Sequence, residues 1–93
     1  MASGVNNHLV VIASDTISTG EVQAGAGGQV NVPISFPQGM TLVAVTARET
    51  TGGNLFPVWY NYPDEQNSFI RVKYANLRTS AYTAGVQVIA LFM

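Results

Sequence analysis

The residues with the clearest chemical potential are an aromatic run and the two basic residues that follow it. The run LFPVWYNY covers residues 55–62, and Arg71 and Lys73 share one face of the next predicted strand. Aromatic rings stack on the apolar faces of sugars, while amide, guanidinium and ammonium groups bond sugar hydroxyls. The candidate ligand contacts are therefore Trp59, Tyr62, Arg71 and Lys73.

Trp59 supports two interpretations. Regular alternation along the run places it with Asn61 on a polar-leaning face near the two basic residues, while Phe56 and Tyr60 favour core packing. Trp, Tyr and Arg are also enriched where subunits meet, so the same surface suits a subunit interface. A ligand site and a subunit interface both stay open for Trp59.

Few residues of the sequence could support catalysis. His8 is the single histidine and has no Asp or Cys beside it, which leaves little from which to build a Ser-His-Asp triad. A zinc site needs three or four ligands, and the chain has no cysteine and no second histidine, so we interpret His8 as surface or interface structure. Asp64 and Glu65 are adjacent and point apart on a strand. With Asn67 they lack EF-hand spacing, and a polar turn accounts for all three. The sequence predicts a non-enzyme that needs no metal and no cofactor.

Charge and length limit the classes of partner that the protein could bind. The 93 residues include 4 Lys plus Arg and 5 Asp plus Glu, and 10% are charged, compared with about 25% in typical proteins. A nearly neutral surface does not attract nucleic acid or an anionic membrane. No apolar run is long enough for a membrane-spanning helix, and the start lacks a basic segment, so we expect no signal peptide. Low charge and a small core favour subunits that bury surface on one another.

Turn signals divide the chain into short strands. Ala24–Gly28 (AGAGG) is expected to be a loop, Pro33 indicates an edge strand or bulge, and Gly85 is expected to launch the last strand. This pattern predicts one all-β domain, 1–93, with 1–6 as a flexible N-terminus: a small antiparallel β-sandwich of six to seven strands. The expected strands are residues 8–13, 16–23, 29–36, 40–48, 55–62, 68–74 and 86–93.

The C-terminal run VQVIALFM is apolar on both faces of a strand. Side chains at alternate positions point to opposite sides, so Val86, Val88, Ala90 and Phe92 should fill the sandwich. In a small antiparallel sandwich the opposite face would normally be exposed to solvent. Because Gln87 is its one polar member, we expect a subunit interface there, formed by Ile89, Leu91 and Met93.

Four segments carry a family resemblance. ISTGEV (17–22), QVNVPISFPQGM (29–40), TLVAVTA (41–47) and the closing VQVIALFM resemble the β-sandwich domains at the tips of phage tail fibres, and are similar to the H-type lectin domain. The resemblance spans about residues 17–93 and implies a trimer that recognises sugars or cell surfaces between protomers. Those lectins usually carry Trp in the final strand, where this chain has Val88 and Ile89, so no ligand residue is transferred.

Two functions follow as expectations. The first is a homotrimeric phage virion component, a receptor-binding or tail-fibre tip domain that recognises a cell-surface glycan. The alternative is a structural head-decoration or fibre protein, whose aromatic surface binds other virion proteins. Either would be located in the virion.

Overall fold

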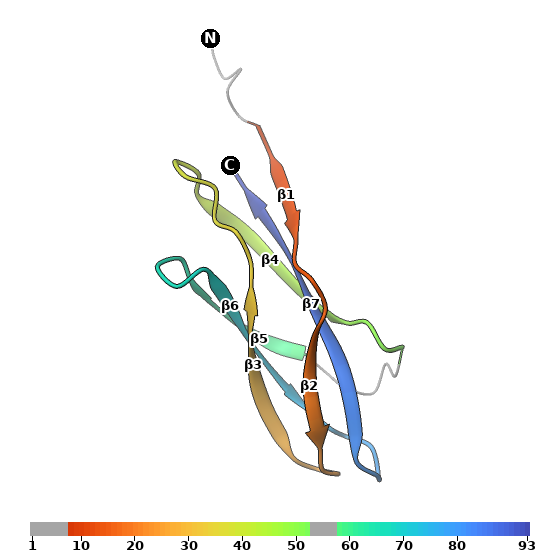
Figure 1. The fold of residues 1–93 in the computed structure, drawn as a ribbon. Helices are drawn as coiled ribbons and strands as arrows, with labels where there is room; N and C mark the ends of the chain where they lie inside the picture. Colours follow the sequence, from red (N-terminus) through yellow and green to blue (C-terminus); the bar gives the residue numbers. More distant parts are fainter. Residues whose placement is uncertain (1–7, 53–57) are drawn as a thin grey trace.

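The computed structural model describes residues 8–52 and 58–93, which form two antiparallel sheets packed face to face (Figure 1). Seven strands and no helix appear in this part of the chain, which confirms the predicted all-β sandwich of six to seven strands. Residues 1–6, predicted to be flexible, and 55–57 of the expected aromatic strand lie outside the described residues.

The first sheet is built around its C-terminal strand. β7 (Tyr82–Phe92) pairs along one edge with β4 (Leu42–Glu49) and along the other with β1 (Val10–Ala13) and β2 (Ile17–Val22). Between β1 and β2, Ser14 keeps contact with β7, because Ser14 N donates to Val88 O (2.8 Å) and Val88 N donates to Ser14 Oγ (2.9 Å). β1 and β2 thus form one interrupted edge strand.

The second sheet has the order β3-β6-β5. β3 (Gly27–Pro33) and β5 (Val58–Asp64) flank β6 (Phe69–Ala75). Pro33 closes β3, which is an edge strand, as its missing N–H donor indicates. The chain then crosses to the first sheet through residues 34–41 (Figure 1).

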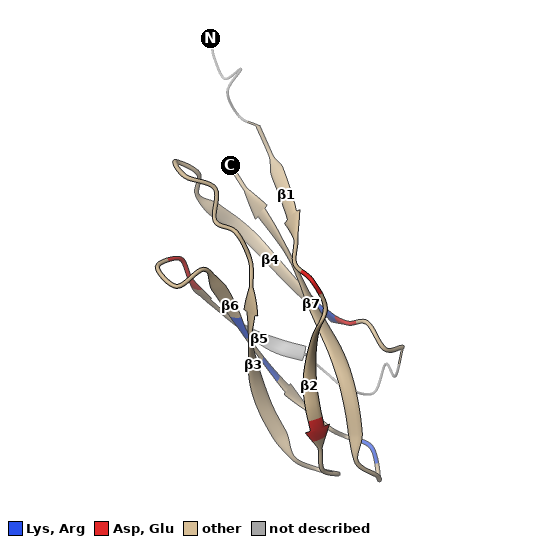
Figure 2. Cartoon of the chain, in the orientation of Figure 1, with Lys and Arg blue, Asp and Glu red and all other residues tan. Residues whose placement is uncertain are grey.

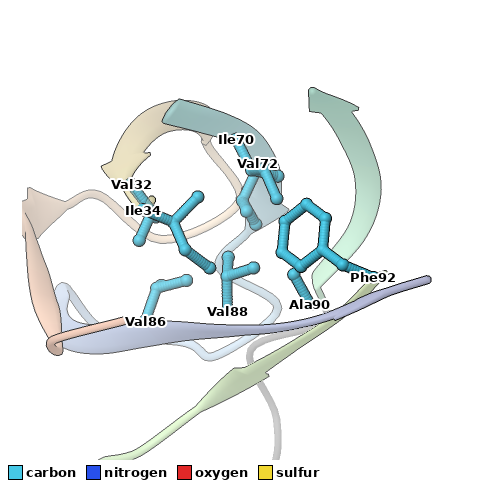
Figure 3. Packing of buried hydrophobic residues seen from close by; sticks show 8 residues of the cluster. All are labelled: Val32, Ile34, Ile70, Val72, Val86, Val88, Ala90 and Phe92. Carbon is cyan, nitrogen blue, oxygen red and sulfur yellow. The ribbon is translucent and has the colours of Figure 1, made fainter. Parts of the chain in front are cut away.

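The core lies between the sheets and is mostly aliphatic, with Phe92 and Tyr74 as the aromatic residues buried in the described part of the chain. Phe92 packs edge-on against Phe36, with ring centroids 5.6 Å apart. Each buried aliphatic side chain contributes about 1.5–3 kcal/mol to stability relative to an exposed one. Figure 3 shows the four members from β7 pointing toward the four from the other layer, and all eight are buried: Val32, Ile34, Ile70, Val72, Val86, Val88, Ala90 and Phe92.

The glycine-rich segment is partly strand. We expected a loop over Ala24–Gly28, but β3 begins at Gly27. Gly28 pairs with Tyr74, and a Cβ on Gly28 would lie 2.8 Å from the Tyr74 hydroxyl. The bare backbone therefore accommodates the phenol ring, whose burial raises the pKa of Tyr74. At Gly28 the missing side chain thus permits close packing, whereas the sequence suggested loop flexibility.

Gly85 lies within the last strand and does not launch it. β7 starts three residues earlier, at Tyr82. A Cβ at Gly85 would lie 2.6 Å from both Thr16 Cγ2 and Thr50 Oγ1, so any other residue there would force these threonine side chains to move. The extra length lets β7 pair with β2 as well as with β1.

The aromatic strand extends beyond its expected C-terminal end at Tyr62. β5 includes Pro63 and Asp64, which we expected in the following turn, and the turn occupies residues 65–68. A register shift between Val58 and Tyr60 interrupts the pairing with β6. This bulge breaks the regular alternation on which the sequence-based face assignment depended.

Replacing Phe92 with alanine should strongly destabilise the sandwich. The side chain is fully buried, so we expect Phe92→Ala to lower the free energy of unfolding by about 3–5 kcal/mol in urea denaturation. Leu77→Ala is the control, because Leu77 is 70% exposed and its truncation should change stability by less than about 0.5 kcal/mol. Similar losses in both variants would contradict the assigned core.

Candidate ligand-binding face

A row of polar and aromatic side chains crosses the outer face of the second sheet. Arg71 on β6 pairs with Tyr62 on β5 and with Asn31 on β3. Directly paired residues project to the same side of a sheet, so the three side chains meet. Arg71 and Lys73 point outward while Ile70, Val72 and Tyr74 of the same strand are buried, as the sequence predicts.

The Arg71 guanidinium is held on three sides. Its Nε donates a hydrogen bond of 2.9 Å to Asn31 Oδ1. Its central carbon lies 5.5 Å from the centroid of the Tyr62 ring and 5.7 Å from that of Phe69. Both distances fit cation–π contacts. Tyr62 remains 46% exposed, so its ring stays accessible.

Lys73 occupies the next outward position of β6. It is exposed and pairs with Gln29 on β3 and Tyr60 on β5. We call Asn31, Tyr62, Phe69, Arg71 and Lys73 together the aromatic–basic face. Figure 2 shows its basic residues on β6, in the middle of the second sheet.

The pairing register of β5 differs from the regular alternation assumed from the sequence. Asn61 was expected to share a face with Arg71 and Lys73, but its register partner is Val72, and its side chain falls outside the described residues. Tyr62 pairs with Arg71, because the bulge shifts the pairing of β5 with β6 by one residue. Trp59 lies within β5 at this bulge, and its side chain falls outside the described residues.

The acidic turn beside this face is held by hydrogen bonds between Asp64 and Asn67. Asp64 accepts hydrogen bonds from Asn67 N (3.1 Å) and Asn67 Nδ2 (2.9 Å). These bonds lower the pKa of Asp64 below its usual 3.8, and the positive charge of Arg71 adds to the effect. The polar-turn interpretation of residues 64–67 is consistent with this geometry.

The described residues hold no cluster of three or more His, Cys, Asp or Glu side chains that could bind a metal ion. His8 is exposed just before β1. Over 8–52 and 58–93, no helix is long and apolar enough to cross a membrane.

The outer face of the first sheet has the opposite character. Leu91 pairs with Val11 on β1 and Ala44 on β4, and Ile89 pairs with Ala13 and Thr46. Val11 is 61% and Met93 48% exposed, whereas Ile89 and Leu91 are half-buried by their neighbours. Charged residues are absent from β1 and the adjoining parts of β4 and β7, which are tan in Figure 2. We call this surface the apolar face; its members are Val11, Ala13, Ala44, Ile89, Leu91 and Met93.

A polar row ends the apolar face. Arg48 Nε donates to Gln87 Oε1 (3.0 Å), and Gln87 Nε2 donates to Ser14 O (3.0 Å). Gln87, which we noted as the polar exception in the C-terminal run, therefore marks the boundary of the apolar face.

Sequence reasoning missed several members of both faces. Asn31 and Phe69 were not singled out, although Phe69 precedes Arg71 by two residues and so shares its face. Val11 and Ala13 were also missed, although the run Leu9–Ala13 is apolar at every position. The partners from β3 and β4 had no such signal, because inter-strand register is set by tertiary pairing.

No protein-family model, curated protein or solved structure significantly matches this chain. The resemblance to fibre-tip and H-type lectin domains remains a prediction.

Removing Asn67 should raise the pKa of Asp64. Because the folded pKa is lowered, this carboxylate stabilises the fold above pH 3.8 and loses that effect as the pH falls through the folded value. A carboxyl-carbon NMR titration should place Asp64 below 3.8, and Asn67→Ala should raise it toward 3.8 more than Arg71→Gln does. A larger rise in Arg71→Gln would show that charge, and not the turn, dominates.

Proposed function

We propose that this protein is a non-enzymatic phage virion component, a homotrimeric receptor-binding or fibre-tip domain that recognises a cell-surface glycan. The observation that carries the proposal is the contrast between its two outer faces. One is apolar, and no further layer of the described residues covers it; the other presents an accessible ring beside a guanidinium held by a hydrogen bond.

The apolar face supports assembly. An antiparallel sheet usually leaves one face in water, and that face is then polar. Here two successive cross-strand rows are apolar except for Thr46, which fits a surface covered by other protomers. The number of three subunits rests on the resemblance to fibre-tip domains.

The aromatic–basic face supports recognition. It lies on the sheet opposite the apolar face, so protomers joined through the first sheet would leave it accessible. A ring for stacking, with guanidinium, ammonium and amide donors around it, is the chemistry that binds sugars. Several weak sites in one oligomer raise the overall affinity through effective concentration.

Placing a charge on the apolar face should separate the protomers. Leu91→Lys puts an ammonium group into the proposed interface, while its aliphatic stem can still cover the sheet. Sedimentation velocity should then show a monomer with the circular dichroism of the wild-type strands. Thr83→Lys, on the same side of β7 but opposite Glu21, is the matched control and should remain oligomeric. A wild-type monomer at micromolar concentration would contradict the assembly.

Truncating Tyr62 should weaken adsorption strongly without changing assembly. We expect Tyr62→Ala to weaken binding to cells and to glycans on an array by about tenfold or more, because each protomer loses its stacking ring. Leu77→Ala removes an exposed apolar side chain from the loop after β6, outside the aromatic–basic face, and should bind normally. Normal adsorption by Tyr62→Ala, with failed incorporation into particles, would favour the alternative of a structural virion protein.

A further inference from the structure

Contacts within the chain position Arg71 without a ligand. Its Nε is bonded to Asn31, and the rings of Tyr62 and Phe69 flank its guanidinium. A free arginine side chain loses about 2 kcal/mol of rotamer entropy when it is fixed. Contacts that already restrict the side chain reduce this loss on binding.

The outer edge of the same guanidinium is unused. Within the described part of the chain, its two terminal nitrogens donate no hydrogen bond and form no ion pair. The positive charge of Arg71 contributes to lowering the pKa of Asp64. The two carboxylate oxygens of Asp64 accept hydrogen bonds from Asn67. The fold thus holds a positively charged fork whose terminal nitrogens bond no described residue, although the Asp64 carboxylate lies close enough to feel its charge.

We propose that the aromatic–basic face selects a sugar that carries a carboxylate. The terminal nitrogens of Arg71 would bind the carboxylate in the bidentate geometry typical of arginine, while the Tyr62 ring stacks on the sugar. Lys73, the next outward residue of β6, adds positive charge on the same face. This inference rests on the proposed glycan-binding function and specifies its ligand class.

Arg48 provides an internal comparison. It too donates from Nε to a side-chain amide on the neighbouring strand, at 3.0 Å, but it lies on the first sheet. Among the described residues no aromatic ring stacks on it. Removing either arginine changes the net charge equally, so the pair separates a local site from general electrostatics.

The test compares tetragalacturonate with its methyl ester, which has the same sugar backbone without the charge. Both are titrated into the full-length assembly, and binding is followed by the NMR signals of arginine Nε–Hε groups and of β5 and β6 amides. Wild-type protein should bind the acid about tenfold more tightly than the ester at low salt. Arg71→Gln should reduce this ratio to about one, and Arg48→Gln should preserve it.

Each other outcome overturns a defined part of the proposal. If wild-type protein binds acid and ester equally while Tyr62→Ala weakens both, glycan recognition stands and the acidic selectivity is wrong. If neither sugar shifts signals of this face, glycan binding here fails together with its selectivity. If tetraglutamate binds as tightly as tetragalacturonate, the face recognises acidic protein segments, and the assignment to sugars is wrong.

Discussion

The fold depends on β7 being hydrogen-bonded along both of its edges while one of its faces is buried. β1, β2 and β4 have their ladder partners in this strand, and four of its side chains fill the core. Because a strand at the centre of a sheet fixes the register of its neighbours, side chains on both faces of the first sheet are placed by β7. Gly85 and Ser14 are local adaptations that let its long ladder continue.

This central position explains why the outer side of β7 is apolar over only part of its length. Near the C-terminus, Ile89 and Leu91 lie between β1 and β4, whose outward residues are small or aliphatic. At Gln87 the hydrogen bonds to Arg48 and Ser14 replace aliphatic contacts with a polar row. An interface formed by this face would therefore have a defined limit along the strand.

The second sheet also has an outward arginine bonded to an amide across the ladder, but this arginine lies in the aromatic–basic face, where aromatic residues flank it. An exposed ring beside a guanidinium whose terminal nitrogens bond no described residue is suited to ligands. The bulge in β5 makes this arrangement possible, since it brings Tyr62 opposite Arg71. The asymmetry between an apolar face and an aromatic–basic face is what supports a binding oligomer.

The sequence by itself determined the class of fold, the core positions of β6 and β7 and the outward direction of Arg71 and Lys73. These follow from alternation within a single strand, which is a local property of the extended backbone. Tertiary structure alone decided that Asn31 and Tyr62 flank Arg71, that Ala44 and Val11 flank Leu91, and that Gly27 and Gly28 belong to a strand. The physical reason is that register, bulges and close packing depend on pairing between distant segments, which no periodicity within one segment encodes.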